Sequence, residues 1–245
     1  MREKGCIPFP PLTEGRLIRR YKRFLADVEL KGGEVVTAHT GNTGRMTLCS
    51  EPGRRVYLSE SQNPKRKLRY TWELIDMGGE AGLVGVNTSL PNRLAALWLG
   101  QGLIGGVPMP DTLRTEARHG NSRLDILLGH PGGKSTFVEV KNCTLAEGGI
   151  ALFPDAPSLR AAKHMGELAG IAESGDRAMV LIVVARGDAS KFAPADHIDP
   201  AFGRALRDAM GRGVELRAFR AGLSAKGAWL GRELPCLPMG PVREG

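Results

Sequence analysis

The chain has no apolar run long enough to cross a membrane. Its longest such run, AMVLIVVA at residues 178–185, is much shorter than a membrane span and is typical of a buried strand. The first residues, MREKGCIPFPPL, carry charges with no apolar stretch behind them, so a secretory signal is not expected. We therefore predict a cytoplasmic protein with no membrane association.

Cysteine is scarce and shows no pairing in the sequence. The four cysteines, Cys6, Cys49, Cys143 and Cys236, form no CxxC motif, so neither a zinc site nor a disulfide framework is predicted. Cys143 shares a strand face with Lys141, but no base stands beside it in the sequence. A nucleophilic cysteine is therefore not predicted.

Common nucleotide-binding and DNA-reading signatures are also missing. Residues 12–86 contain no Rossmann or P-loop fingerprint, and no helix-turn-helix pattern accounts for base-specific readout. What the chain does have is positive charge, with 34 Lys and Arg against 26 Asp and Glu and a net charge of +8. This excess favours a polyanionic partner, either nucleic acid or an anionic membrane surface.

Short strands broken by turns dominate the first part of the chain. Residues 16–30 alternate basic and apolar side chains and are interpreted as one strand, followed by the turn KGGE and the strand EVVTAHT. With the later runs RRVYLSE and LVGVNT, they predict an OB-like β-barrel module over residues 1–86.

Two basic clusters interleaved with aromatic residues lie in this module. Such clusters suit a groove that follows phosphates and lets bases stack, although each alone also fits a solvated face beside core aromatics. Between them, HTGNTGRM forms a turn whose N–H groups, with Asn42, could hold a phosphate, or which is a plain hairpin turn. The predicted nucleic-acid contacts of the clusters are Arg19, Arg20, Lys22 and Arg23 beside Tyr21 and Phe24, and Lys65, Arg66 and Lys67 before Tyr70 and Trp72.

The remaining residues, 87–245, predict a second, α/β domain. A helix over residues 90–106 precedes three strands, and a second helix begins after a capping residue, Ser158, with Met165, Leu168 and Ala169 on its apolar stripe. The segments TLAEGGIALFPDAPS and FAPADHIDP are interpreted as loops. The order of helices and strands is that of a restriction-endonuclease-like core.

A hairpin in this domain carries the strongest chemical signal. The strands LDILL and TFVEVK are joined by GHPGGK, and alternation places Glu139 and Lys141 on one face. If the neighbouring strand brings Asp125 beside Glu139, two carboxylates converge where Mg²⁺ or Mn²⁺ could bind, with Glu116 as a further acid. The alternative is an ordinary solvated hairpin face with a Glu–Lys pair.

Phosphate-contacting residues are predicted around this hairpin. Lys163 and His164 lie on the polar side of the second helix, and Arg123 precedes Asp125. His164 is also spaced like half of a metal pair with Glu167, but a third ligand is missing.

The chain resembles the sugar fermentation stimulation proteins over nearly its whole length. The segments that carry the resemblance are LIRRYKRFLADV, HTGNTGRM, NPKRKLRYTWEL, VNTSLPNRL, SRLDILL to VEVKNCTLAE, FPDAPSLRAAKHMGEL and FAPADHIDP. The resemblance implies an OB-like module followed by a PD-(D/E)xK nuclease-like domain, with Asp125, Glu139 and Lys141 as the catalytic pattern and Glu116 as a supporting acid. It also implies DNA binding and a link to the regulation of sugar utilisation, in particular of maltose.

Two functions remain open from the sequence. The leading hypothesis is a DNA-binding protein with a nuclease-like metal pocket, and the alternative is an active Mg²⁺-dependent nuclease that cleaves DNA or RNA. In the second case Asp125 and Glu139 bind the metal and Lys141 positions water or stabilises charge on the phosphate.

Overall fold

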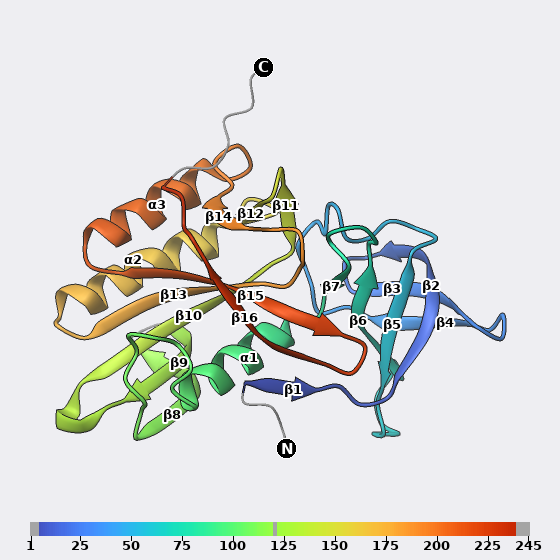
Figure 1. Ribbon diagram of the computed structural model, residues 1–245, viewed down its shortest axis with the longest axis horizontal. Coiled ribbons are helices and arrows are strands. Elements are labelled where there is room, and N and C mark those ends of the chain that lie inside the picture. Colours follow the sequence, from blue (N-terminus) through green and yellow to red (C-terminus); the bar gives the residue numbers. More distant parts are fainter. Residues whose placement is uncertain (1–4, 120–121, 239–245) are drawn as a thin grey trace.

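The computed structural model describes residues 5–119 and 122–238. A barrel of short strands lies on one side of the molecule, and a larger sheet flanked by helices lies on the other (Figure 1). Within the described residues, no helix is both long and apolar enough to cross a membrane.

Five strands close the barrel. They are β2 (Leu12–Tyr21), β3 (Leu25–Leu30), β4 (Val35–His39), β5 (Arg55–Glu60) and β6 (Tyr70–Asp76). β2 pairs antiparallel with β3 and β5, β3 with β4, and β5 with β6, while β4 closes the ring by a parallel pairing with β6. The short β7 (Leu83–Gly85) extends the sheet beside β6. This connectivity is that of the predicted OB-fold.

The barrel corrects one prediction about its first strands. The sequence predicts one strand over residues 16–30, but the chain reverses at Lys22 and Arg23, whose φ angles are +47° and +62°. The reversal produces the β2–β3 hairpin, in which Tyr21 pairs with Leu25. The alternation of basic and apolar residues continues through a tight turn, and alternation alone does not reveal a turn of this kind.

The second domain is built on a seven-stranded sheet. Its spatial order is β1-β16-β15-β13-β10-β9-β8. The strands are β1 (Cys6–Pro8), β8 (Thr112–His119), β9 (Ser122–Gly129), β10 (Ser135–Cys143), β13 (Arg177–Val184), β15 (Glu215–Ser224) and β16 (Gly227–Leu234). The β9–β10 hairpin, joined through the 3₁₀ turn Pro131–Gly133, confirms the predicted hairpin. β10, β13 and β15 run parallel at the centre, which explains why β13 is almost uniformly apolar.

Three helices cover the two faces of this sheet. α1 (Ser89–Gly100) packs on one face, with Trp98 and Leu94 completely buried. α2 (Leu159–Glu173) and α3 (Pro200–Gly211) cover the other. Ser158 caps α2 by accepting the N–H of Ala161 at 3.2 Å, as the sequence predicts. α1 ends six residues before the predicted Gly106, because Gly102 takes a left-handed φ of +64°.

A small third sheet replaces two predicted loops. β11 (Leu145–Glu147) and β12 (Ile150–Phe153) form a hairpin, and β14 (Lys191–Pro194) pairs in parallel with β12. Their short apolar runs bury Leu145, Leu152 and Ala193 in a local cluster. The sheet supports the chain that leads from β12 into α2.

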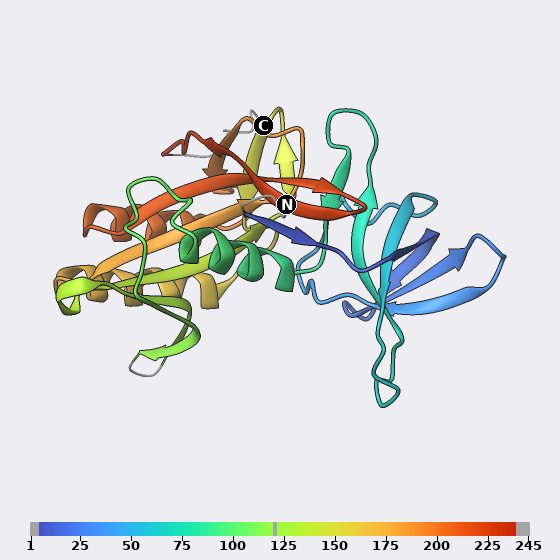
Figure 2. The ribbon, with the colours of Figure 1, turned by 60° about the horizontal axis from the view of Figure 1, so that its bottom comes forward.

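The first described residues belong to the second domain, and the chain enters the barrel after them. β1 pairs antiparallel with β16, and the carbonyl of Gly5 accepts the indole N–H of Trp98 at 2.9 Å. Figure 2 shows β1 beside β16 and α1. Residues 5–8 therefore pack with the sheet of the second domain, although they fall within the segment 1–86 assigned from the sequence to the first module.

Candidate metal and nucleic-acid site

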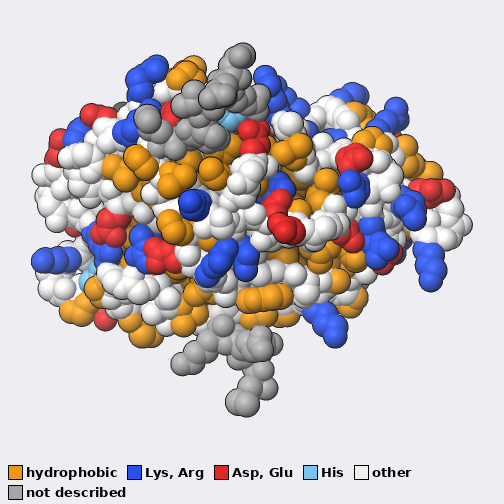
Figure 3. Space-filling view, turned by 45° about the horizontal axis from the view of Figure 1, so that its top comes forward, with side chains coloured by type: hydrophobic (Ala, Val, Ile, Leu, Met, Phe, Trp, Pro, Cys, Tyr) orange, Lys and Arg blue, Asp and Glu red, His pale blue; other side chains and the backbone are white. Residues whose placement is uncertain are grey.

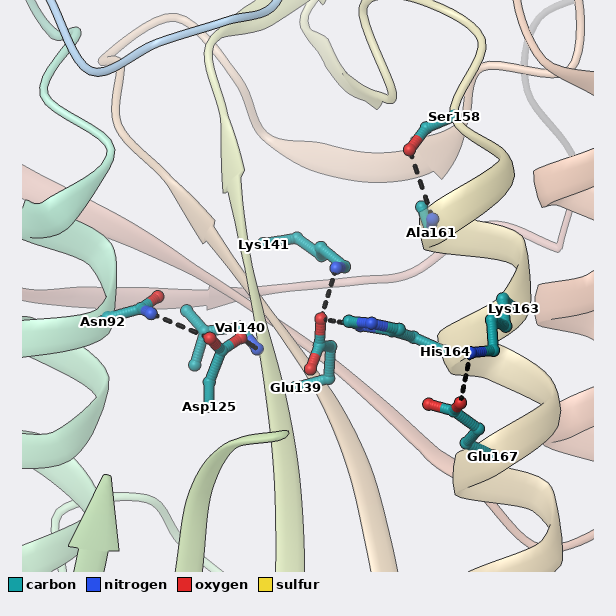
Figure 4. A network of polar contacts seen from close by, with 10 residues as sticks. All are labelled: Asn92, Asp125, Glu139, Val140, Lys141, Ser158, Ala161, Lys163, His164 and Glu167. Atoms are coloured by element: carbon teal, nitrogen blue, oxygen red, sulfur yellow. Dashed lines mark hydrogen bonds and ion pairs between the residues drawn. The ribbon is translucent and has the colours of Figure 1, made fainter. Parts of the chain in front are cut away.

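Asp125 and Glu139 lie close together where the pairing of β9 with β10 ends, and Figure 4 shows them on either side of the strand that carries Glu139. The strands are paired as far as Val138 and Ile126. At the next step the Oδ2 atom of Asp125 accepts the backbone N–H of Val140 at 2.8 Å. The Asp125 side chain thus takes the place of a strand carbonyl, which holds its carboxylate against β10. The Asp125 carboxylate therefore lies near enough to Glu139 to feel its charge.

The carboxylate of Glu139 is held from one side only. Its Oε1 atom accepts the ammonium of Lys141 at 2.6 Å and also contacts Nδ1 of His164 on α2. Glu139 and Lys141 point to the same face of β10, as strand alternation predicts. The Oε2 atom of Glu139 is buried and has no protein partner within the described residues.

The two carboxylates differ in proton affinity. Burial and the neighbouring Glu139 charge raise the pKa of Asp125, in spite of its bond from Val140. Burial alone would also raise the pKa of Glu139, but the His164 hydrogen bond and the Lys141 charge outweigh it and lower that pKa. Two adjacent acids with opposite shifts are typical of functional sites.

This acidic pair opens into a cleft of about 760 Å³ between the barrel and the second domain. One wall is the barrel loop Gly41, Asn42, Thr43, Gly44 and Arg45. The other walls include Asp125, Glu139, Lys141 and the first turn of α2. The HTGNTGRM turn and the predicted metal acids therefore share one cavity, although about 80 residues separate them in sequence.

The donor set fits a hard divalent cation with few protein ligands. A buried carboxylate oxygen without a partner, Glu139 Oε2, is the kind of atom that such a cation satisfies. No group of three or more His, Cys, Asp or Glu able to hold a metal occurs in residues 5–119 and 122–238. A bound cation would then complete its shell with water or phosphate oxygens, as Mg²⁺ commonly does.

The structure does not bring Glu116 to this pair. Its register position on β8 lies between Thr115, which pairs with Ile126, and Ala117, which pairs with Leu124. However, its φ of +55° interrupts the strand, and its side chain is 65% exposed and ion-paired with Arg123. Neither Glu116 nor Arg123 lines the cleft, so the prediction that they meet metal or phosphate there has no geometric support.

The structure also differs from the prediction that Lys163 and His164 on α2 contact phosphate. His164 is buried against Glu139 and is not on a phosphate-contacting surface. Lys163 is exposed, pairs with Glu167 at 3.4 Å and does not line the cleft. Arg160, one turn before His164, lines it instead. Which of these side chains faces the cleft depends on how α2 is rotated on the sheet, because successive residues point in directions about 100° apart around the helix axis.

The basic turns of the barrel emerge from one end. Tyr21 pairs with Leu25, and Leu25 pairs with His39. Ala38 in turn pairs with Tyr70, which pairs with Glu60. The same end of the barrel therefore carries three connections, which are the turn 22–24, the loop after His39 and the turn 61–69. Arg23, at this end, lines the cleft. The opposite end, with the β3–β4 hairpin, points away from the second domain (Figure 1).

Several residues that the sequence predicts to contact nucleic acid are already bonded to other groups of the protein. Arg19 bonds Asp27 at 2.8 Å, and Arg66 donates to Thr71 at 2.7 Å. Arg20 donates to backbone carbonyls of the 41–45 loop, and Asn42 accepts the N–H of Gly44 at 2.9 Å. Four exposed cations of the two clusters have side chains with neither an ion pair nor a hydrogen bond in the described part of the chain, namely Lys22, Arg23, Lys65 and Lys67.

The aromatic residues beside the clusters are not equivalent. Trp72 is fully buried, and its indole N–H donates to the carbonyl of Leu74 at 3.0 Å. Phe24, in the turn next to Arg23, is 48% exposed. Phe24 is therefore an available stacking surface, and Trp72 belongs to the barrel core.

Sequence reasoning missed Asn92 and undervalued Asp155. Asn92 on α1 donates to Oδ1 of Asp125 at 2.9 Å, and an amide on a largely apolar helix was the only local signal. Asp155 accepts the N–H of Met46 at 3.0 Å and lines the cleft. Cys143 is buried in the core, which raises the pKa of its thiol to about 12, in agreement with no nucleophilic role.

An OB barrel joined to a restriction-endonuclease-like sheet, with an acidic pair and a lysine in the cleft between them, defines a nuclease-like class of protein. Within this class, the chain belongs to the sugar fermentation stimulation protein family. The family's RE domain matches residues 89–227, and its N-terminal OB domain matches residues 18–86. Both the resemblance and the fold that the sequence predicts are thereby confirmed.

Relatives support this assignment over most of the chain. The sugar fermentation stimulation protein homolog of Geobacter sulfurreducens is 50% identical over 93% of this chain and 97% of that protein. The homolog from Acidithiobacillus ferrooxidans is 48% identical over 88% and 93%. A solved structure, that of Pyrococcus furiosus SfsA in complex with Ca²⁺, has a TM-score of 0.84 at 30% identity and covers 94% and 98%.

Proposed function

We propose that this protein is a divalent-metal-dependent nuclease that hydrolyses phosphodiester bonds of DNA. The observation that carries the proposal is the acidic pair itself. Asp125 and Glu139 are adjacent in a cleft, and Glu139 presents a buried oxygen with no protein partner. The related Pyrococcus furiosus protein is described with Ca²⁺, which supports divalent-cation binding, and Mg²⁺ or Mn²⁺ is the ion we propose for catalysis.

Each residue of the cluster has a defined task in this proposal. Asp125 and Glu139 hold the cation, which supplies Lewis-acid stabilisation of the phosphate and lowers the pKa of bound water. Lys141 places a positive charge beside the same site, where negative charge develops on the phosphate. His164 and Asn92 contact the far sides of the two carboxylates and keep them in position.

The barrel supplies the grip on nucleic acid. In OB-folds, the loops between the first two and the last two barrel strands bind oligonucleotides. Here they are the turns 22–24 and 61–69, which carry the basic clusters and leave the barrel at one end. On the face shown in Figure 3, basic side chains are spread over both domains with acidic ones among them. We therefore assign binding to these turns rather than to the overall net charge.

Binding without cleavage is the second candidate function. The exposed cations Lys22, Lys65 and Lys67 are on turns separate from the acidic pair, so they would hold DNA whether or not a phosphodiester is cut. Such a protein would act in the regulation of sugar utilisation, as the family name suggests, and we propose maltose metabolism as one target.

One experiment separates the two functions. Supercoiled plasmid, single-stranded DNA and RNA are incubated with the protein in Mg²⁺, in Mn²⁺ and in chelator. Metal-dependent cutting that Asp125→Asn abolishes, while DNA binding is retained, establishes the nuclease and shows which nucleic acid it prefers. Binding to DNA with no cutting under any of these conditions supports the regulator.

A further inference from the structure

The barrel loop 41–45 is organised by one arginine. The guanidinium of Arg20 donates from Nη2 to the carbonyl of Asn42 at 2.8 Å and to that of Gly44 at 2.9 Å. It also donates from Nη1 to the carbonyl of Arg45 at 3.2 Å. Three carbonyls of this short loop thus point toward a single planar cation.

This arrangement directs the loop N–H groups to the opposite side. In a trans peptide, the carbonyl of one residue and the N–H of the next point in opposite directions. The N–H groups of Thr43, Arg45 and Met46 therefore point away from Arg20. That of Met46 already bonds a carboxylate oxygen of Asp155 at 3.0 Å, so this side of the loop accepts an anionic oxygen.

The other two N–H groups are free for a ligand. Within the described residues, those of Thr43 and Arg45 have no protein acceptor. Both residues line the cleft and are exposed. The N–H of Gly44, between them, donates to the Asn42 side chain, so the Thr43 and Arg45 N–H groups are the pair that can bind one anion together.

The loop is seated directly on the second domain. A Cβ atom on Gly44 would lie 2.5 Å from Oδ1 and 2.6 Å from Oδ2 of Asp155, so only glycine allows this approach. Asp155 precedes α2, whose first turn lines the same cleft as Lys141. The loop therefore stands in a definite position relative to the acidic pair.

Charge in the cleft favours an anion. Its basic residues outnumber its carboxylates, which are Asp125, Glu139 and Asp155. The basic residues that line it are Arg20, Arg23, Arg45, Lys141 and Arg160.

We propose that the 41–45 loop is a second phosphate subsite, which binds a phosphodiester of the same strand that is held over Asp125 and Glu139. The substrate strand then passes through the cleft and touches both domains, and the barrel takes part in positioning the scissile bond. Arg20 acts as the organiser of this subsite and does not itself contact phosphate. This inference rests on the proposed function and deepens it.

The first test replaces the organiser but keeps its charge. In Arg20→Lys, an ammonium cannot span three carbonyls as the guanidinium does, so the loop loses its orientation. The matched control is Arg54→Lys, another barrel arginine that bonds one carboxylate and one carbonyl, outside the cleft. The probe is a labelled oligothymidylate of about 12 nucleotides, titrated by fluorescence anisotropy in Ca²⁺ at several salt concentrations.

We expect Arg20→Lys to lose about tenfold in oligonucleotide affinity, and Arg54→Lys to bind as wild type. The dependence of affinity on salt should stay the same, because N–H donors release no counterions. Calorimetric Ca²⁺ binding should also be unchanged, since the acidic pair is intact. Thermal unfolding of each variant checks that Arg20→Lys is folded.

A second variant tests the same subsite without changing Arg20. Gly44→Ala forces the loop and Asp155 apart, and its control is Gly32→Ala, where a Cβ meets no atom within 4 Å. The same loss of affinity in Gly44→Ala, with Gly32→Ala at the wild-type level, supports the subsite. Wild-type affinity in both Arg20→Lys and Gly44→Ala overturns it. If the wild type binds neither Ca²⁺ nor the oligonucleotide, the proposed function fails as well.

Discussion

His164 on α2 contacts, through Nδ1, the Oε1 atom of Glu139 on β10, the same oxygen that the Lys141 ammonium bonds at 2.6 Å. Both donors engage one oxygen, so the other, Oε2, is left without a protein partner in the described part of the chain. Partners behind a ligating side chain orient it and tune its affinity for the metal. His164 thus links the packing of α2 to the direction of the Glu139 carboxylate.

This contact predicts a difference between two substitutions of similar polarity. His164→Asn keeps an N–H donor near the place of Nδ1, whereas His164→Gln moves the donor toward the place of Nε2. We expect His164→Gln to lose about 10- to 100-fold in Ca²⁺ affinity and His164→Asn to lose much less. Isothermal calorimetry measures both. Equal losses in the two variants would show that His164 only fills space.

Lys141 is predicted to act on the reaction rather than on metal binding. Lys141→Met keeps the length of the side chain but removes its charge. We expect phosphodiester cleavage to fall about 100-fold or more, with Ca²⁺ binding retained because the ammonium is not a ligand. Plasmid cleavage in Mg²⁺ and calorimetry in Ca²⁺ give the two readouts. An unchanged cleavage rate, or a loss of Ca²⁺ binding that accounts for the slower cleavage, would contradict this role.

The raised pKa of Asp125 predicts that this residue costs the apo protein stability. An acid whose pKa is raised on folding stabilises the fold while protonated, and this contribution is lost as the pH rises through the folded pKa. Asp125→Asn should therefore raise the Tm by a few degrees at neutral pH without metal, and the gain should shrink in acid. With Ca²⁺ present, the order should reverse, because only the wild type gains from binding.

Glu139 provides the matched comparison for this pH dependence. Its lowered pKa means that its charge stabilises the fold above the unfolded pKa, and this contribution disappears as the pH falls through the folded pKa. Glu139→Gln should lower the Tm at neutral pH and approach the wild type in acid. Calorimetric unfolding curves from acid to neutral pH, with chelator, measure both variants. Parallel pH profiles for the two variants would show that the opposite shifts are wrong.

Two aromatic residues near the basic clusters are predicted to have opposite phenotypes. Phe24→Ala should leave stability within about 0.5 kcal/mol but weaken oligothymidylate binding by about 1–3 kcal/mol, because Phe24 is exposed beside Arg23. Trp72→Ala should cost about 3–5 kcal/mol of unfolding free energy, because Trp72 fills the barrel core. Urea unfolding and anisotropy titration measure the pair. Normal binding by Phe24→Ala would remove the stacking role.

Much of the fold and part of the site follow from short periodicities in the sequence. The period of two in VEVK places Glu139 and Lys141 on one strand face. The 3.6-residue period predicts that Met165, Leu168 and Ala169 are buried on α2, and the capping preference places Ser158 at its start. These features depend only on residues a few positions apart, and the structure confirms each.

The tertiary structure decided what lies across from these residues. His164 faces Glu139 because of the rotation of α2 on the sheet, and Glu116 leaves the site because of one left-handed residue in β8. The loop 41–45 lines the same cleft as the acidic pair only because the barrel docks on the second domain, where Met46 bonds Asp155. Strand register, helix rotation and domain docking are set by packing between distant segments, so no local pattern in the sequence encodes them by itself.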